Sequence, residues 1–274
     1  MLDLHSHILP NIDDGARTLS EALEMARIAV ADGTTCLACT PHITPGIYEN
    51  RADNISTAVA SLTRALADAE IPLKLVVGAD VHVSPHLTER LRSGVVPTLN
   101  NSRYFLLEPP HHVVPPRIGH LVDEVLERGF IPIITHPERL TWISSHYDVI
   151  ERLNDQGCLI QLTAGSIVGS FGKTASMLSE RLLKEGRVDI IASDAHNVSS
   201  RSPRLSPAVR KVAEMLGADA AERMVVDRPW AILEDRPVVP AGQEARNDRS
   251  QASGGKKAKE GSGSISWFRR WFGS

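Results

Sequence analysis

Short, nearly continuous apolar runs alternate along the chain with longer segments in which apolar residues recur at helical spacing. Apolar runs of this kind predict parallel strands that are buried on both faces of a sheet. Glycine or proline separates most runs from the segment that follows. We therefore expect strands over residues 2–6, 35–40, 73–79, 104–107, 131–135, 158–163 and 188–193.

Helices are expected between these strands. The first begins at Thr18, whose hydroxyl can cap it with Glu21 as the capping-box partner, and it ends near Gly33. A short helical stretch follows the third strand. The longer helical segments cover about residues 50–69, 116–128, a stretch that ends at 157, then 172–185 and 206–226.

About seven strand–helix units favour an α/β fold, with a closed or nearly closed β/α barrel as the natural architecture. An open doubly wound sheet is the alternative. That fold normally has a glycine-rich phosphate loop after its first strand. Here the first strand ends in His5-Ser6-His7 instead.

Composition limits the classes of function. The chain has 274 residues, 42% of them hydrophobic, which is enough for one large domain with a sizeable core. Its net charge of -3 gives no reason to expect nucleic-acid binding. Three scattered cysteines fit a reducing compartment better than a disulfide framework. Because no signal peptide or membrane-length apolar run is visible, we expect a cytoplasmic protein.

The character of the chain changes after about residue 240. Residues 241–264 are rich in Gly, Ser, Lys, Arg and Gln, a composition typical of disorder. The aromatic and basic segment Trp267–Phe272 follows. We expect a folded domain over residues 1–239 and a disordered basic tail over 240–274. One interpretation is that this amphipathic segment binds a partner or the inner face of the membrane. The other is that it is only the apolar end of a disordered tail.

His5 and His7 lie two residues apart on the first expected strand, so their side chains face the same side. Two imidazoles in this arrangement can bind one metal ion. The pair alone is a weak signal, because an exposed strand end without any ligand also explains it.

Carboxylates and histidines follow nearly every later strand. In a β/α barrel the C-terminal ends of the strands converge on one face, where active sites lie. The residues at these ends are Asp13, Asp14, His42, Asp80, Glu108, His136, Asp194 and His196. They are too many for one tetrahedral ion and indicate two or three divalent ions, such as Mn²⁺, Fe²⁺ or Zn²⁺, with bridging carboxylates. Such centres activate water and bind phosphoryl oxygens.

Two arginines narrow the class of substrate. Arg139 and Arg201 fall in loops expected over the same face, and a guanidinium group matches a phosphate with two parallel hydrogen bonds. A salt bridge, for instance between Arg139 and Glu138, is the alternative for these side chains.

The remaining histidines are not expected to bind metal. His82 is a candidate for supporting a ligand, and His111 and His112 are candidates for lining the entrance. The others look like ordinary loop or helix residues; they are His86, His120 and His146.

Together these motifs resemble those of the polymerase and histidinol phosphatase (PHP) superfamily. The opening LHSHILPNIDDG, followed by TPH, THPER and SDAHN, is most similar to one branch, the bacterial manganese-dependent tyrosine phosphatases of capsule and exopolysaccharide operons. The resemblance spans about residues 1–235 and leaves out the tail.

The resemblance implies a distorted seven-stranded β/α barrel with a trinuclear metal centre, which hydrolyses phosphotyrosine on a cognate bacterial tyrosine kinase. It implies that Arg139 and Arg201 hold the phosphate, while His196 could also help the tyrosyl oxygen leave. Asp80 departs from the pattern, because this branch usually has Glu there. The implied metal ligands are His5, His7, Asp14, His42, Asp80, Glu108, His136, Asp194 and His196.

Other functions stay open. One is hydrolysis of a small phosphomonoester, as in histidinol phosphatases. Another is C–N bond hydrolysis by an amidohydrolase, a class that often uses a carbamylated lysine at a strand end. Here Lys74, the only lysine in the first 170 residues, begins a strand. The third is a non-catalytic scaffold for a kinase. The sequence does not determine the oligomeric state.

Overall fold

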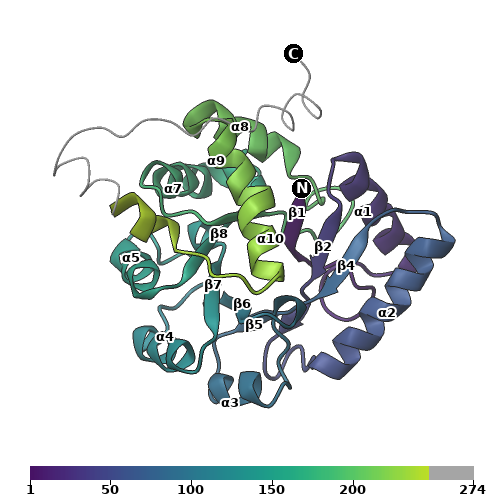
Figure 1. Cartoon of the computed structure of the whole chain (residues 1–274), viewed down its shortest axis with the longest axis horizontal. Helices are drawn as coiled ribbons and strands as arrows, with labels where there is room; N and C mark the ends of the chain where they lie inside the picture. Colours follow the sequence, from purple (N-terminus) through teal and green to yellow (C-terminus); the bar gives the residue numbers. More distant parts are fainter. Residues whose placement is uncertain (247–274) are drawn as a thin grey trace.

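The computed structural model describes residues 1–246, in which parallel strands are surrounded by helices (Figure 1). The strands form a three-stranded sheet of order β1-β2-β4 and a six-stranded sheet of order β3-β5-β6-β7-β8-β9. Every pairing between neighbouring strands is parallel. The strands are β1 (Leu2–Ser6), β2 (Cys36–Cys39), β3 (His42–Ile43), β4 (Lys74–Val77), β5 (Asp80–His82), β6 (Tyr104–Glu108), β7 (Ile131–Thr135), β8 (Leu159–Thr163) and β9 (Ile190–Ala192).

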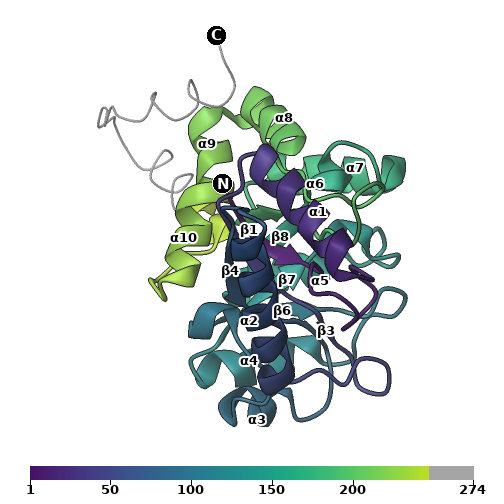
Figure 2. The same cartoon turned by 90° about the vertical axis from the view of Figure 1, so that its right-hand side faces the viewer.

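The helices lie outside the strands, with α1 and α2 together on one side of the molecule (Figure 2). Thr18 caps α1 as expected, since its hydroxyl oxygen accepts a hydrogen bond from the Glu21 N–H at 3.1 Å. The helices are α1 (Leu19–Ala31), α2 (Ala52–Asp68), α3 (Leu87–Arg92), α4 (Ile118–Glu127), α5 (Tyr147–Gln156), α6 (Ala164–Ile167), α7 (Gly172–Lys184), α8 (Ser206–Leu216), α9 (Ala218–Glu222) and α10 (Arg228–Leu233).

The expected strands over residues 35–40 and 73–79 are found as β2 and β4. After a short break, each is followed by a second, short strand that was not expected, β3 or β5. Pro41, which has no N–H to donate, lies at the first break. Gly78 lies at the second, where a Cβ atom would come within 2.8 Å of the Leu99 side chain. His42 and Asp80 therefore follow the C-terminal ends of β2 and β4, as expected, but each also begins a second, short strand.

Hydrogen bonds nevertheless carry the pairing across these breaks. The Gly78 N–H donates to the Cys39 carbonyl at 3.0 Å, and the Asp80 N–H donates to the Pro41 carbonyl at 3.1 Å. The two broken strands therefore stay side by side as they pass from one sheet to the other.

The first strand also contacts the segment that follows the last one. Ser6 and Ala195 form an isolated parallel bridge. The His7 N–H donates to the Ala195 carbonyl and the Asp194 N–H to the His5 carbonyl, both at 2.8 Å. These bonds place the C-terminal ends of β1 and β9 next to each other.

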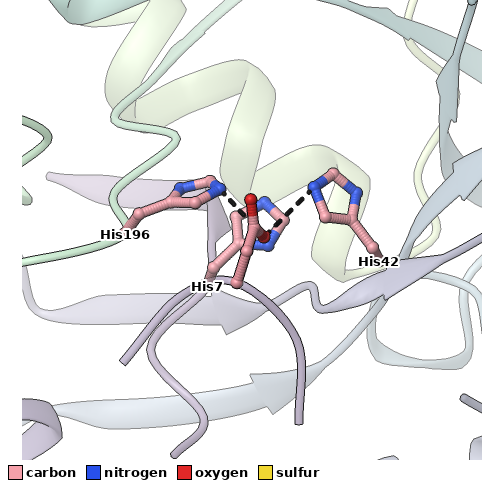
Figure 3. A group of neighbouring side chains, drawn as sticks. His7, His42 and His196 are labelled. Atoms are coloured by element: carbon pink, nitrogen blue, oxygen red, sulfur yellow. Dashed lines mark ion pairs between the residues drawn. The ribbon is translucent and has the colours of Figure 1, made fainter. Parts of the chain in front are cut away.

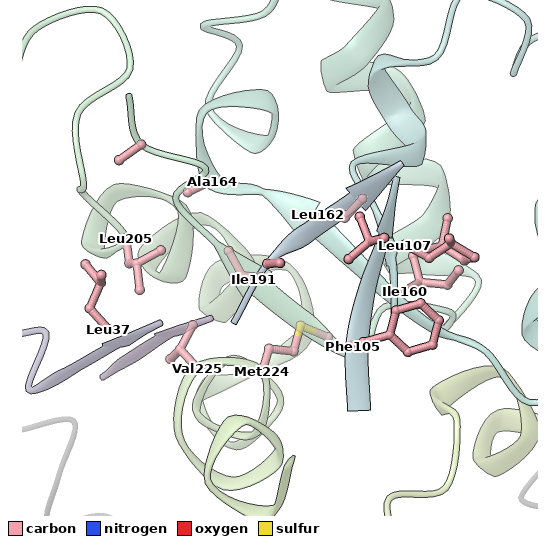
Figure 4. Packing of buried hydrophobic residues seen from close by; sticks show 14 of the residues in the cluster. Leu37, Phe105, Leu107, Ile160, Leu162, Ala164, Ile191, Leu205, Met224 and Val225 are labelled. Carbon is pink, nitrogen blue, oxygen red and sulfur yellow. The ribbon is translucent and has the colours of Figure 1, made fainter. Parts of the chain in front are cut away.

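Apolar side chains pack on both faces of the strands. Phe105 and Leu107 of β6 belong to the larger core cluster, which includes helical residues such as Met224 (Figure 4). Tyr104 and Leu106 of the same strand belong to a second cluster, which α10 covers with Ile232 and Leu233. This burial on both faces confirms the interpretation of the continuous apolar runs.

The last helical region differs from the expected single segment over residues 206–226. The region divides at Gly217, where α8 ends and the backbone adopts a positive φ of 92°. It also contains a π-helical turn over Arg223–Asp227. The chain then continues as α10, which the sequence pattern did not predict.

Residues just past 240 pack against the body of the protein. Ala241 is buried, and its N–H donates to the carboxylate of Asp189 at 2.8 Å. Glu244 pairs with Arg228 at 2.5 Å. The segment Trp267–Phe272 lies outside the described residues. Within residues 1–246, no helix is long and apolar enough to cross a membrane.

Candidate metal centre

The centre begins with His5 and His7, which are both fully buried. The Nδ1 atom of His5 lies 2.8 Å from the Gln161 side-chain oxygen, and Nδ1 of His7 lies 2.7 Å from Asp13. These partners orient the rings, as second hydrogen bonds do for metal-binding histidines. The Nε2 atoms thus face each other at 3.1 Å, and each lies 3.4 Å from Oδ1 of Asp194.

The loop after β1 separates the roles of two neighbouring aspartates. The buried Asp13 carboxylate pairs with His7 and accepts the His42 N–H at 3.1 Å. The Asp14 side chain is 47% exposed, and its Oδ1 lies 3.5 Å from Nε2 of His42 and 3.4 Å from Nε2 of His196. Figure 3 shows His42 and His196 on opposite sides of His7, with these ion pairs as dashed lines. Asp13 thus holds a histidine, while Asp14 faces the centre.

The middle of the centre is formed by β3, β5 and β6. Nδ1 of His42 lies 3.3 Å from Oδ2 of Asp80 and 3.4 Å from Oε2 of Glu108. Asp80 also lies 3.5 Å from Nε2 of His5. Asp80 is fully buried. Although its side chain is one methylene shorter than that of Glu, it reaches both histidines.

Glu108 extends the cluster towards the loop after β7. Its Oε1 lies 3.7 Å from Nε2 of His136 and 3.7 Å from Nε2 of His111. His136 and Asp194 both have left-handed backbones, with φ of 34° and 51°. Non-glycine residues adopt this conformation at a cost that is common at functional sites.

Burial and neighbouring charges shift the pKa values of three histidines in the centre. Burial alone would lower the pKa of His5, but Asp80 and Asp194 raise it to about 9. Burial also opposes protonation of His42, whose pKa Asp80 and Glu108 raise to about 12. Burial and the neighbouring His7 lower the pKa of His196 to about 4. The buried carboxylates thus favour positive charge beside them, which is the charge that a divalent cation carries.

The donor set fits divalent cations. The side chains of the centre form four groups of potential ligands, and within each group the ligand atoms lie within 4.8 Å of one another. His7, His42, Asp80 and Glu108 each belong to two of these groups. Among the described residues, several buried polar atoms of the cluster have no hydrogen-bond partner; they are His42 Nδ1, Asp80 Oδ2, His136 Nδ1 and His196 Nε2. Buried polar atoms are normally paired, so these unpaired atoms suit a cluster that binds ions.

Both arginines reach the centre through Asp194. Arg201 donates to Oδ2 of Asp194 at 2.6 Å, and Arg139 donates to the same oxygen. The Phe171 ring lies beneath them, 4.3 Å from the Arg139 guanidinium carbon and 5.8 Å from that of Arg201. The alternative pairing of Arg139 with Glu138 is not formed, since Glu138 is buried and accepts the Thr163 N–H.

The structure brings all the expected ligands and both arginines to one face. Sequence reasoning missed three contributors: Gln161, Phe171 and the proximity of His111 to Glu108. Gln161 lies within a strand and Phe171 in a loop, and neither belongs to a recognisable motif. The cysteines are buried and unpaired, and burial raises the pKa of each thiol, so a cysteine phosphatase site is disfavoured.

Comparison with known proteins gives consistent relatives. The chain is 33% identical over 219 residues to the tyrosine-protein phosphatase YwqE of Bacillus subtilis, which covers 80% of this chain and 86% of YwqE. It is 32% identical to the putative tyrosine-protein phosphatase CapC of Staphylococcus aureus, covering 73% of this chain and 79% of CapC. It is 28% identical to the tyrosine-protein phosphatase CpsB of Streptococcus pneumoniae, covering 86% and 99%.

Solved structures agree. A structure from a study of YwqE and CpsB, described as unique metal-dependent tyrosine phosphatases, superposes with a TM-score of 0.85 at 31% identity, covering 88% of this chain and 98% of that one. A β-aspartyl dipeptidase of Fervidobacterium islandicum matches with a TM-score of 0.53 at 15% identity, covering 88% and 75%, and so shares the fold alone.

The match to a family extends over nearly all the described chain. The profile of the family described as capsular polysaccharide synthesis, CpsB/CapC, matches residues 1–234. This confirms the branch that the sequence motifs indicated. The chain therefore belongs to the CpsB/CapC family.

Proposed function

We propose that this protein is a metal-dependent tyrosine phosphatase, and so a phosphoric monoester hydrolase. The observation that carries the proposal is the convergence of buried histidines, carboxylates and two arginines around Asp194. The activity named for YwqE, CapC and CpsB supports it.

The centre would hold two or three divalent ions, with Mn²⁺ as the first candidate and Fe or Zn as alternatives. The four overlapping ligand groups support more than one ion, because His7, His42, Asp80 and Glu108 each belong to two of them. Bound ions would supply activation of water and neutralisation of phosphoryl charge. We assign as ligands the nine residues His5, His7, Asp14, His42, Asp80, Glu108, His136, Asp194 and His196.

The arginines would bind the phosphate. Each uses one amino group on Asp194, which leaves other N–H donors of the guanidinium groups for phosphoryl oxygens. His196 is the candidate proton donor to the tyrosyl oxygen. Burial and His7 lower its pKa to about 4, so it is neutral near pH 7, which suits a ligand better than an acid.

The two sheets would form the expected distorted seven-unit barrel. Taking β2 with β3 and β4 with β5 gives seven strand positions, and the bridge between Ser6 and Ala195 joins the first to the last. We propose residues 1–239 as the phosphatase domain and residues 240–274 as a tail, whose first residues pack against the domain.

The cellular role follows from the family. We propose a tyrosine kinase of capsular or exopolysaccharide synthesis as the substrate protein, and the cytoplasm as the place of action. Contact of Trp267–Phe272 with the inner face of the membrane stays a prediction.

An amidohydrolase is the alternative with the same kind of fold. Lys74 is exposed at the start of β4 and lies 5.9 Å from the Trp230 ring. A bridging lysine would be expected at the C-terminal end of a strand, where active sites of such barrels lie, whereas Lys74 begins β4.

The test compares substrates on one metal-loaded preparation. We expect phosphate release from a phosphotyrosine peptide, with slower release from histidinol phosphate and no hydrolysis of a β-aspartyl dipeptide. Preference for histidinol phosphate would favour a small-molecule phosphatase, and hydrolysis of the dipeptide alone would refute the proposal.

A further inference from the structure

We propose that His111 is an additional protein ligand of the metal centre, at the end formed by Glu108 and His136. The proposal rests on the metal centre of the proposed function. It adds a residue to the nine positions assigned above, and it concerns a histidine that the sequence pattern placed only at the entrance.

The geometry of three side chains carries the proposal. Ligand atoms of His111, Glu108 and His136 lie within 4.8 Å of one another. The Nε2 atoms of both histidines are 3.7 Å from the same Glu108 oxygen, Oε1. This distance is too long for a hydrogen bond. It suits two atoms on one ion, because ligands about 2.1 Å from a metal lie about 3 to 4 Å from each other.

The second oxygen of Glu108 serves a different group. Oε2 lies 3.4 Å from Nδ1 of His42, and His42, Glu108 and Asp80 form a separate set of potential ligands. A carboxylate with one oxygen in each set is placed to bridge two ions. His111 is the third member of the set that also contains Glu108 and His136.

The backbone around His111 is fixed in place. The His111 carbonyl accepts hydrogen bonds from the N–H and hydroxyl of Thr141, at 2.9 and 3.0 Å. The preceding carbonyl, of Pro110, accepts a hydrogen bond from the buried Trp142 indole at 2.9 Å. Thr141 and Trp142 closely follow the turn that carries His136. The loop after β6 is therefore held beside that turn, which preorganises the two histidines.

His111 also lies between the centre and a pocket. It lines, with Arg139 and Phe171, a pocket of about 370 Å³. His111 thus lines the same pocket as Arg139, which is proposed to bind phosphate, so a ligand role for His111 would place it near bound substrate.

His112 provides a matched control. It is the next residue, of the same type, and its Nδ1 lies 3.4 Å from the Thr141 hydroxyl. It is exposed, and it belongs to none of the ligand groups. A general effect of losing a histidine from this loop would appear equally in both variants.

The first experiment measures Mn²⁺ binding to the metal-free full chain by calorimetry. We expect His111→Ala to weaken the binding of one ion by about 10- to 100-fold, while His112→Ala binds as the wild type does. Identical isotherms for all three proteins would overturn the proposal.

The second experiment detects the bond itself. A thiolate is a strong ligand for divalent metals, so His111→Cys loaded with Co²⁺ should show a thiolate-to-cobalt absorption band that wild type and His112→Cys lack. A band in neither variant, or in both equally, would overturn the proposal. Neither readout uses turnover, so failure of the proposed phosphatase activity is detected separately.

Discussion

Asp194 is the residue on which the site converges. One of its oxygens faces His5 and His7, and the other accepts from Arg139 and Arg201. The same carboxylate therefore links the metal cluster to the groups proposed to bind phosphate, and fixes both guanidinium groups before substrate arrives.

Replacing Arg139 tests this arrangement at the level of one side chain. We expect Arg139→Ala to lower kcat for a phosphotyrosine peptide by about 10²- to 10³-fold, the usual loss for one preorganised charge-stabilising donor. Arg152→Ala removes a guanidinium that pairs with Asp148 on the surface and should leave turnover unchanged. Equal activity of both variants would show that Arg139 has no role in catalysis.

Phe171 supports both arginines through its aromatic ring. Its ring lies within 6 Å of both guanidinium carbons. A cation–π contact contributes about 0.5 to 1 kcal/mol, so Phe171→Leu should lower kcat/KM by about two- to fivefold. Phe171→Tyr should retain the wild-type value. Steady-state kinetics decide this, and a tyrosine variant as impaired as the leucine variant would argue against stacking.

At the scale of an element, the loop after β1 depends on Gly15. A Cβ atom there would lie 2.0 Å from the His7 carbonyl oxygen and 2.5 Å from the His7 Cβ, so only glycine fits. The loop also carries Asp13 and Asp14, which contact three histidines of the centre. Close packing of the loop on His7 therefore positions a large part of the donor set.

We expect Gly15→Ala to lower the free energy of unfolding by about 1 to 3 kcal/mol, as overpacking does, and to reduce the bound Mn²⁺. Gly119→Ala is the control. Gly119 lies in α4, and a Cβ atom there would be at an ordinary contact distance of 3.5 Å from the Gln156 side chain. Denaturant unfolding and metal analysis provide the readouts. Unchanged metal content in Gly15→Ala would mean that the loop tolerates displacement.

The order and type of most elements could be predicted because apolar strands and capped helices leave local signals. Thr18 at the start of α1 is an example. The strands β3 and β5 were missed, because they are only 2 and 3 residues long and leave no apolar run of their own. The ligands were found from their positions after strands. Phe171 was missed, and His111 was expected only at the entrance, because their contacts depend on which loops meet in space.

For the whole molecule, the free energy of unfolding should depend on pH through Asp189, a buried acid just before the start of β9. Burial raises the pKa of Asp189 to about 7, despite Arg228 and two backbone N–H donors. The folded state thus holds this proton more tightly than the unfolded state, whose aspartate titrates near its ordinary value of 3.8. The stability that protonated Asp189 provides is full below about pH 4 and is lost as pH rises through about 7.

Asp189→Asn should remove this dependence. We expect the difference in unfolding free energy, variant minus wild type, to rise by the order of a few kcal/mol between pH 4 and 7. Metal ligands titrate in both proteins, so their contribution cancels in the difference. Asp148→Asn, at an exposed ion pair, should follow the wild type. Parallel curves for Asp189→Asn and wild type would contradict the raised pKa.

The most direct test of the account is to add Mn²⁺ stepwise to metal-free protein while measuring phosphate release from a phosphotyrosine peptide. The account predicts negligible release without metal, activity that rises until more than one ion is bound per chain, and loss of activity when a chelator is added. It also predicts that His5→Ala stays inactive at Mn²⁺ concentrations that saturate the wild type. Full activity of the metal-free protein, or none at any metal occupancy, would contradict the central claim.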